Sequence, residues 1–274
     1  PPRSTLFPYT TLFRSASYGI GRAYALELAK RGYDIVLVAR SADKLEAVAE
    51  EIRATHGKTA TPIALDLTEP DAPTQLFSRL QADGIAIDFL MNNAGFGDYG
   101  AFATSDRGKI VAMVQLNVLA LTDLTYQFLQ PMIERKSGTI VNIGSIASFQ
   151  PLPYMAVYAA TKAFVLNFTE ALWAENADTG VRFLACCPGA TETEFFKTAG
   201  FLENGFSSAQ PPLSSPESVV QATFEALDRS NDATVVAGTA IDKAMSFLPR
   251  FLPRELLAKG AASQFRPKSN DNKS

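Results

Sequence analysis

The 274-residue sequence predicts one α/β domain, built on a doubly wound parallel sheet with helices on both faces. Two observations predict this class. Short apolar segments alternate with amphipathic segments along most of the chain, and strands that alternate with helices form right-handed βαβ crossovers. Glycine, asparagine and other polar residues follow the apolar segments, and sheets of this kind bind ligands beyond the carboxyl ends of their strands.

Each expected strand is a short run of apolar, largely β-branched residues, as strands buried on both faces of a parallel sheet are. Six runs meet this description, at residues 34–40, 61–67, 85–95, 139–143, 181–189 and 233–237. The run at 9–13 falls where the first, central strand belongs. Its two threonines fit that place poorly, because a central strand should be continuously apolar.

The expected helices lie between these runs, and start and stop signals mark their ends. Gly32 ends the first helix, which follows a glycine turn, and Ser41 is expected to cap the second, with Asp43 in its first turn. The others are expected at residues 71–82, 105–135 with a bend at Pro131, 154–177, 216–227 and 241–257, the last interrupted by Pro249 and Pro253. Residues 190–214 are expected to be irregular, and residues 265–274 polar and disordered.

The composition excludes several classes of function. The chain carries 25 basic and 28 acidic residues, a net charge of −3, whereas a nucleic-acid surface needs a basic patch. The single His56 and the adjacent pair Cys186 and Cys187 argue against a metal site and a disulfide framework. No apolar run reaches the ~18 residues of a membrane span. We therefore expect a cytoplasmic protein, in a compartment that keeps thiols reduced.

The strongest chemical signal lies in residues 138–164. The segment opens as a strand, and Ser145 follows the end of that strand. Tyr158 and Lys162 stand four residues apart on the next helix, so they share one helix face. A free phenol has a pKa of ~10, and a nearby ammonium lowers that pKa by favouring the phenolate. Alone, the pair is a weak signal, because a buried tyrosine beside a surface lysine is common.

Further motifs stand at the ends of other strands and on one long helix. They are Ser17-Tyr18-Gly19-Ile20-Gly21, Asn92-Asn93-Ala94-Gly95, the mid-helix Asn117, and Pro188-Gly189 followed by Thr191 and Thr193. Together with the spacing of Ser145, Tyr158 and Lys162, these motifs resemble the short-chain dehydrogenase/reductase family. The resemblance runs from Ala16 to about Ala237, and it implies a Rossmann-type fold.

The resemblance also implies four catalytic residues. Tyr158 is expected to act as the general acid in reduction, or as the general base in oxidation. Lys162 is expected to lower the pKa of Tyr158 and to bind the nicotinamide ribose. Ser145 is expected to polarise the carbonyl oxygen of the substrate. Asn117 is expected to hold a water that connects Lys162 to solvent.

The end of the second strand indicates the preferred cofactor. NAD-binding sites place a carboxylate there for the ribose 2′-hydroxyl, but this chain has Ala39 and Arg40, and no carboxylate before Asp43. Arginine pairs well with a 2′-phosphate, so NADP(H) is expected over NAD(H). By resemblance, further cofactor contacts are expected at Ser17, Tyr18, Gly19, Ile20, Asp66, Leu67, Asn93, Ala94, Gly95, Tyr158, Lys162, Pro188, Gly189, Thr191 and Thr193, with Asp66 and Leu67 beside the adenine.

The start of the chain does not resemble the family. Residues 5–15, TLFPYTTLFRS, resemble the conceptual translation of a sequencing-adapter oligonucleotide, and the alternative is a natural N-terminus or targeting peptide. Arg14 and Ser15 stand where the family has a threonine and its first glycine. We expect residues 1–15 to be an artefact, 16–260 to form the dinucleotide-binding catalytic domain, and 261–274 to form a polar tail.

These observations predict an NADPH-dependent oxidoreductase that interconverts a small apolar ketone and a secondary alcohol. Four phenylalanines in the 190–214 segment, which is suited to a lid over the site, favour an apolar substrate. One alternative is a reductase of 3-oxoacyl thioesters. Another is a non-catalytic dinucleotide-binding protein, against which the intact set of four catalytic residues argues.

Two expectations concern larger contacts of the chain. By resemblance, a homodimer or homotetramer is expected, built on the long helices at 105–135 and 154–177. The segment at 244–257, AMSFLPRFLPRELL, is suited to lie on a membrane surface, to cover the pocket, or to pack on the domain.

Overall fold

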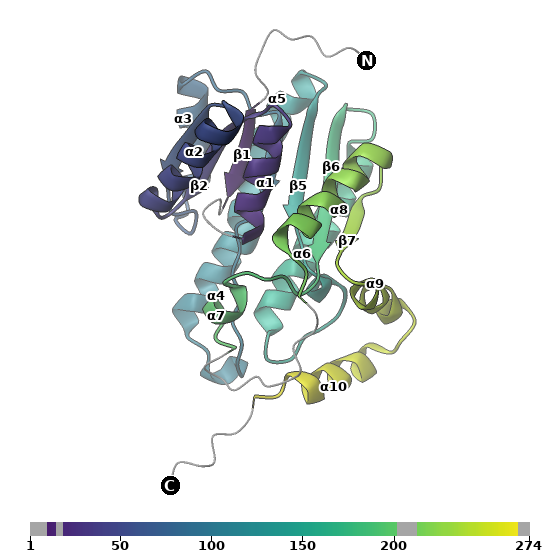
Figure 1. Cartoon of the computed structure of the whole chain (residues 1–274). Helices are drawn as coiled ribbons and strands as arrows, with labels where there is room; N and C mark the ends of the chain where they lie inside the picture. Colours follow the sequence, from purple (N-terminus) through teal and green to yellow (C-terminus); the bar gives the residue numbers. More distant parts are fainter. Residues whose placement is uncertain (1–9, 15–18, 202–212, 268–274) are drawn as a thin grey trace.

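The computed structural model describes residues 10–14, 19–201 and 213–267. Its centre is a seven-stranded, all-parallel sheet with the order β3-β2-β1-β4-β5-β6-β7 (Figure 1). The strands are β1 (Thr10–Arg14), β2 (Asp34–Ala39), β3 (Ala60–Ala64), β4 (Phe89–Asn92), β5 (Gly138–Ile143), β6 (Val181–Pro188) and β7 (Thr234–Ala237). The order reverses between β1 and β4, and this reversal is the point at which doubly wound sheets bind ligands.

Helices cover both faces of the sheet, as expected for this class. They are α1 (Gly19–Lys30), α2 (Ala42–His56), α3 (Ala72–Ala82), α4 (Arg107–Val114), α5 (Ala120–Glu134), α6 (Ala156–Glu175), α7 (Phe195–Thr198), α8 (Pro216–Arg229), α9 (Ala240–Phe247) and α10 (Arg254–Phe265). Short turns of 3₁₀ helix are η1 (Phe102–Thr104), η3 (Ile146–Phe149) and η4 (Leu248–Arg250), and η2 (Gln115–Leu119) is a π-helical segment. The predicted fold class is confirmed.

Alternating residues of the strands build two separate cores. In β2, Ile35 and Leu37 join the apolar cluster beneath α1, α2 and α8, whereas Val36 and Val38 join the cluster beneath α3 and α5. This alternation follows from the two-residue period of a strand. Both clusters hold the carboxyl ends of the strands in a fixed register, and those ends carry the functional residues.

The central strand β1 contains a polar side chain that nothing satisfies among the described residues. β1 pairs with β2 and β4, placing Leu12 between Val36 and Leu90. Thr11 is completely buried, and its hydroxyl has no hydrogen-bond partner in the part of the chain that the structure describes. The poor fit of threonine to a central strand, expected from the sequence, is confirmed at Thr11.

Substituting Thr11→Val is expected to stabilise the protein by about 1–2 kcal/mol, because it removes an unsatisfied buried hydroxyl and keeps the β-branched shape. The melting temperature should rise by a few degrees, at about 2–4 °C per kcal/mol for a large domain. The matched control is Thr10→Val. Because Thr10 is only half-buried, this substitution should raise the melting temperature less than Thr11→Val does. A melting temperature of Thr11→Val at or below that of the parent would contradict this account.

Several boundaries differ from the expectations. β3 and β4 end before residues 66–67 and 93–95, which leave the sheet as loops at the site edge. Ser41 stands at the N-cap of α2, but its side chain makes no capping hydrogen bond. The long helix is interrupted by the π-helical segment η2, and α5 continues through Pro131. α10 continues to Phe265, beyond the expected end at residue 257.

One helical stretch changes the expectation about membrane spans. Within the described residues, the helical stretch Arg107–Glu134 is long and apolar enough to cross a membrane by length and composition. Helices that cover the sheet of a globular domain meet the same criteria, and α5 packs on α3 and on the sheet. The sequence expectation concerned an unbroken apolar run, and this stretch meets the different criterion of length and mean composition.

Candidate active site

The end of β5 and the start of α6 bring the predicted tyrosine, lysine and serine together. Lys162 is buried, and its Nζ donates a hydrogen bond to the carbonyl oxygen of Ile143, at 2.7 Å. The Oγ of Ser148 donates to the carbonyl oxygen of Lys162 at 2.8 Å, which ties α6 to the loop after β5. Ser145 opens η3, and its Oγ accepts a hydrogen bond from the amide of Ala147.

Asn117 lies in the π-helical segment η2, a type of irregularity that often marks functional sites. Its buried amide donates to the carbonyl oxygen of Phe96 and to the Oγ1 of Thr161, both at 3.1 Å, and accepts from the amide of Phe96 at 3.3 Å. The side chain therefore ties the loop after β4 to α6. The backbone irregularity in η2 was not predicted, because hydrophobic periodicity alone does not indicate a π-helical segment.

Gly95 lies where Asn117 and Lys162 approach each other. A Cβ at position 95 would stand 3.0 Å from the Oδ1 of Asn117 and 3.4 Å from the Nζ of Lys162. The distance to Asn117 is tighter than most Cβ contacts, so glycine allows this loop to approach Asn117 closely. The structure thus brings Asn117, Lys162 and Gly95 to one place.

A buried polar ladder beneath the site was not predicted. The Nδ2 of Asn92 donates to the Oδ1 of Asn142 at 2.9 Å, and the Nδ2 of Asn142 donates to the Oγ1 of Thr169 at 3.0 Å. Asn92 and Asn142 are neighbours in the register of β4 and β5. The ladder fixes the ends of these two strands relative to α6. Asparagines near the ends of two expected strands were the only sequence signal for it.

Tyr158 is partly buried in an aromatic cluster beneath α7. The ring of Phe195 lies 5.1 Å from the ring of Tyr158, centroid to centroid, and Phe196 packs edge-on against Phe195. Burial raises the pKa of Tyr158 to about 12, and the Ser145 hydroxyl lowers it in part. The Nζ of Lys162 lies 5.8 Å from the centroid of the Tyr158 ring. The net shift of the Tyr158 pKa is therefore upward, whereas a lowering was expected, because burial is its largest cause.

Substituting Phe195→Ala is expected to lower the pKa of Tyr158 from about 12 toward its usual value of 10.0. The reason is that burial disfavours the phenolate, and removing the ring admits water. Tyrosinate absorbance, measured as the difference between each variant and its Tyr158→Phe counterpart, gives this pKa. Phe196→Ala is the control, because Phe196 packs on Phe195. This variant should lower the pKa of Tyr158 less than Phe195→Ala does. An unchanged pKa in Phe195→Ala would show that the lid does not cause the shift.

The residues expected to bind the dinucleotide gather at the switch point between β1 and β4. Gly19 opens α1 with a φ of +52°, a left-handed conformation that favours glycine. α1 has no acidic residue in its first turn, so the positive end of its dipole is open to an anion such as phosphate. Ile20 follows in the same turn. Ser17 and Tyr18 lie outside the described residues.

Arg40 is exposed directly after β2 and makes no ion pair with any described residue. The Oδ1 of Asp66 accepts hydrogen bonds from the amide and hydroxyl of Thr68, which shapes the loop after β3. The side chain of Leu67 is buried in the core beneath α3, so that position offers a ligand only its backbone. Asn93 is half-buried and Ala94 is buried at the end of β4.

The end of β6 joins the same edge. The amide of Gly189, next to Pro188, donates to the carbonyl oxygen of Ala237 at 2.9 Å. Thr191 is buried and donates to the carbonyl oxygen of Gly189 at 3.0 Å. The methyl group of Thr193 would lie 2.8 Å from a Cβ at Gly19, so the lid segment touches the glycine turn.

These residues fit a dinucleotide with a phosphorylated ribose. The helix terminus and the left-handed glycine suit a pyrophosphate, and an exposed arginine without an acidic partner among the described residues suits a further phosphate. When bound, the cofactor supplies a hydride. The protein would hold it with the switch-point residues and with Lys162.

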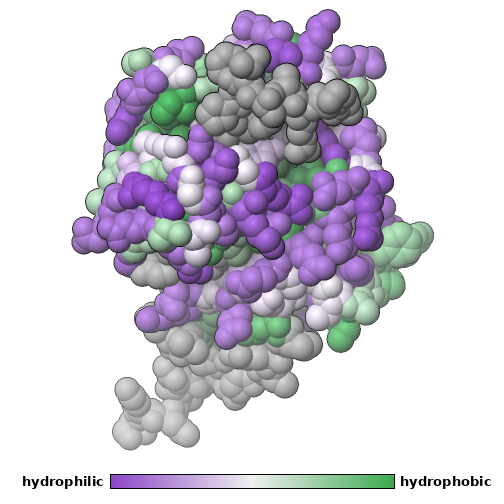
Figure 2. Space-filling model, turned by 45° about the horizontal axis from the view of Figure 1, so that its top comes forward, coloured by the Kyte–Doolittle hydropathy of each residue, from purple (hydrophilic) through white to green (hydrophobic). Residues whose placement is uncertain are grey.

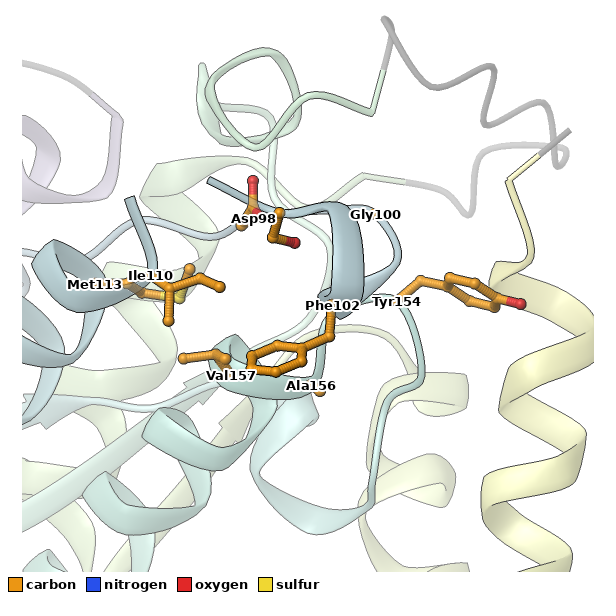
Figure 3. Close-up of a pocket in the computed structure, with 9 residues that line it drawn as sticks. Asp98, Gly100, Phe102, Ile110, Met113, Tyr154, Ala156 and Val157 are labelled. Carbon is orange, nitrogen blue, oxygen red and sulfur yellow. The ribbon is translucent and has the colours of Figure 1, made fainter. Parts of the chain in front are cut away.

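A small space of about 10 Å³ adjoins the site between η1, α4 and the start of α6 (Figure 3). Phe102, Val157 and Ile110 point into it, whereas the ring of Tyr154 points away, toward α10 (Figure 3). Asp98 at its edge forms an ion pair of 2.7 Å with Lys109. The space is too small to hold a substrate.

Comparison with known proteins establishes the family. A sequence model described as "short chain dehydrogenase" matches residues 10–200, which is more than half of the chain. The chain belongs to the short-chain dehydrogenase family. Members of this family are oxidoreductases that act on hydroxyl and carbonyl groups with NAD(P), so the expected family and enzyme class are confirmed.

Three similar proteins illustrate the family. A ketoacyl reductase, HetN, from a Nostoc species is 32% identical over 89% of this chain and 84% of its own length. A short-chain dehydrogenase from Sphingobium yanoikuyae, solved with NADPH, is 34% identical, covers 90% of this chain and 96% of its own, and has a TM-score of 0.76. A "bulky-bulky ketone specific alcohol dehydrogenase" from Comamonas testosteroni is 30% identical, covers 91% and 96%, and has a TM-score of 0.75. The chain spans 60% of the length of two further relatives, one from Pseudocercospora fijiensis and one from Mus musculus.

Proposed function

We propose that this enzyme reduces apolar ketones to secondary alcohols with NADPH. The observation that carries the proposal is the environment of Tyr158. Its hydroxyl is hydrogen-bonded to Ser145, the Nζ of Lys162 lies 5.8 Å from the centroid of its ring, and the ring of Phe195 packs against it. A phenol with a pKa of about 12 is fully protonated at neutral pH. The protonated phenol is the form that a general acid in reduction requires.

In this proposal Tyr158 donates its proton to the carbonyl oxygen of the substrate. Ser145, whose side chain lies within reach of the phenol, polarises the same oxygen. The buried ammonium of Lys162 stabilises the phenolate that proton transfer leaves behind, because an opposite charge favours the charged form. Asn117 holds the loop after β4 against α6 and positions Lys162. By resemblance to the family, Asn117 also holds a water molecule that connects Lys162 to solvent.

The apolar character of the substrate is inferred from the residues around Tyr158. The cluster includes Tyr99, Leu152, Met155, Phe201 and the lid residues Phe195 and Phe196. Ligand pockets lined in this way favour apolar groups. The name of the Comamonas testosteroni relative, which refers to bulky ketones, is consistent with this inference.

A second candidate substrate is a 3-oxoacyl thioester. The Nostoc relative is named a ketoacyl reductase, and this similarity extends over most of both chains. A long acyl chain would also suit the aromatic cluster. A third candidate, a non-catalytic dinucleotide-binding protein, is disfavoured because all four catalytic residues are present and grouped at one place.

The experiment is a substrate panel. NADPH oxidation is measured with apolar ketones of increasing size, with polar ketones and with 3-oxoacyl thioesters. We expect the highest kcat/KM for a large apolar ketone. A higher value for thioesters would favour the second candidate, and NADPH binding without turnover of any substrate would favour the third.

We also propose a cytoplasmic homodimer or homotetramer. Exposed apolar side chains on the long helices support the oligomer, among them Val114, Leu119 and Phe164. Val114 also lines an apolar groove of about 480 Å³ between α4 and α6, whose lining includes Phe102 and Val157. Light scattering at micromolar concentration should give at least twice the chain mass, and a monomer would contradict the proposal.

A further inference from the structure

The C-terminal helices expose an unusual concentration of large apolar side chains. Among the described residues, fourteen large hydrophobic side chains are exposed, and seven of them lie between Ile241 and Leu256. We call these seven the C-terminal apolar face: Ile241, Met245, Phe247, Leu248, Phe251, Leu252 and Leu256. Contiguous exposed apolar groups of this kind mark interaction sites, whereas single ones do not.

Helix α9 is oriented with its polar residues inward. Its buried side chains are Asp242 and Ser246, and the carboxylate of Asp242 accepts hydrogen bonds from the amide and hydroxyl of Thr239. Ile241 and Met245, also four residues apart, face outward, and Ile241 is 66% exposed. A surface helix normally buries its apolar side. The reverse orientation leaves the apolar side of α9 exposed in the part of the chain that the structure describes.

The same segment is basic, although the chain as a whole is acidic. Residues 240–266 contain five basic and two acidic side chains, a net charge of +3, against −3 for the whole chain. Lys243, Arg250 and Arg254 are exposed and form no ion pair with any residue in the described part of the chain. One acidic side chain, Asp242, is buried and already bonded to Thr239. The outward charge of this segment is therefore positive.

The segment stands outside the layered body of the domain and is fixed to it. In Figure 1, α9 and α10 lie beyond the carboxyl ends of the strands, and Figure 2 shows hydrophobic surface at the edge of the molecule on the side of α9. The hydroxyl of Tyr99 donates to the carbonyl oxygen of Phe265 at 3.0 Å, and Ala261 is buried, so the inner side of α10 is anchored. The rings of Phe247 and Phe251 lie 5.1 Å apart, centroid to centroid, and are presented together.

We propose that the C-terminal apolar face and its basic side chains form a docking surface for an anionic lipid bilayer. Phenylalanine and leucine side chains flanked by arginine and lysine match the composition of segments that lie in the membrane interface. Phe247, Phe251 and Leu252 would enter the boundary between head groups and acyl chains. Lys243, Arg250 and Arg254 would pair with anionic head groups.

The charges favour a lipid surface over a second copy of this chain. A symmetric contact between two copies of this face would bring together two surfaces that each carry the positive charges of Lys243, Arg250 and Arg254. Like charges in contact disfavour such a pairing. An anionic bilayer neutralises all three charges and covers the apolar side chains at the same time.

The test is sedimentation of the full chain with vesicles of phosphatidylcholine, with and without phosphatidylserine. We expect binding to the phosphatidylserine vesicles, and on the order of tenfold weaker binding to phosphatidylcholine alone. Raising the salt to about 1 M, where the Debye length is about 3 Å, should remove this difference. Failure of the parent chain to bind phosphatidylserine vesicles would overturn the proposal.

Two variants locate the surface. Phe247→Ser/Phe251→Ser should weaken vesicle binding by about tenfold or more, while circular dichroism remains that of the parent. The control Tyr126→Ser removes a comparably exposed side chain from the long helical stretch, and its binding should match that of the parent. Loss of binding in the control alone would move the site to that stretch. A smaller oligomer in Phe247→Ser/Phe251→Ser would show that the face joins two copies. Either result overturns the proposal.

Discussion

Replacing Tyr158 with phenylalanine is expected to lower kcat by about 10²–10⁴-fold, the range typical for loss of a general acid. The phenyl ring keeps the contact with Phe195, so the fold and the affinity for NADPH should change little. The effect should appear in kcat, because proton donation acts in the transition state and not in binding. Steady-state rates with the best ketone of the panel and a fluorescence titration with NADPH provide the two measurements.

The control for this substitution is Tyr126→Phe, which removes an exposed phenol hydroxyl on α5, away from the site. It should retain the parental kcat. Near-normal turnover in Tyr158→Phe would remove Tyr158 from the role of acid. An equal loss of NADPH affinity would show instead that the hydroxyl serves the cofactor site.

The double substitution Ala39→Asp/Arg40→Ser is expected to reverse the cofactor preference. Arg40 is exposed at the end of β2, where a 2′-phosphate would meet it. A charge-assisted hydrogen bond contributes about 1.5–3 kcal/mol, which is roughly 10–100-fold in kcat/KM. The introduced carboxylate adds repulsion of the phosphate, and it accepts a hydrogen bond from a free ribose hydroxyl. The ratio of kcat/KM for NADPH to that for NADH should fall by about 100-fold or more.

Arg40→Lys is the matched control, because it keeps the positive charge at position 40 and removes the planar guanidinium group. It should lower the ratio less than the double substitution, because lysine keeps the positive charge but loses the bidentate geometry. An unchanged ratio in the double variant would mean that the phosphate is bound by other residues.

The sequence was sufficient to predict the fold and the grouping of the site. Strand and helix periods differ, so most elements could be assigned from the pattern, and the parallel sheet collects the strand ends at one edge. Tyr158 and Lys162 lie four residues apart on α6, so their common face follows from helix geometry alone. These features depend on local sequence and on general rules of chain topology.

The features that could not be predicted depend on contacts between distant segments. Burial raises the pKa of Tyr158, and the ring of Phe195 that packs against it comes from a later segment of the chain. The ladder from Asn92 through Asn142 to Thr169 depends on the register of β4 and β5. Sequence spacing does not contain this information.

The orientation of α9 is a further example. Its sequence shows an apolar side and a polar side, but a sequence pattern normally implies that the apolar side faces the core. The structure places Asp242 and Ser246 inside instead, because Thr239 satisfies the carboxylate of Asp242. The exposure of the C-terminal apolar face could therefore be recognised only in three dimensions.

The most direct test of the proposed function is a single-turnover reaction with NADPH that carries deuterium at the transferable position. The enzyme is mixed with the labelled cofactor and a large apolar ketone, and the product alcohol is analysed by mass spectrometry. We expect one deuterium at the carbinol carbon, formed at least about 100-fold faster by the parent chain than by Tyr158→Phe. Bound NADPH with no transfer of deuterium to any ketone or thioester would contradict the account and would identify the chain as a dinucleotide-binding protein without this activity.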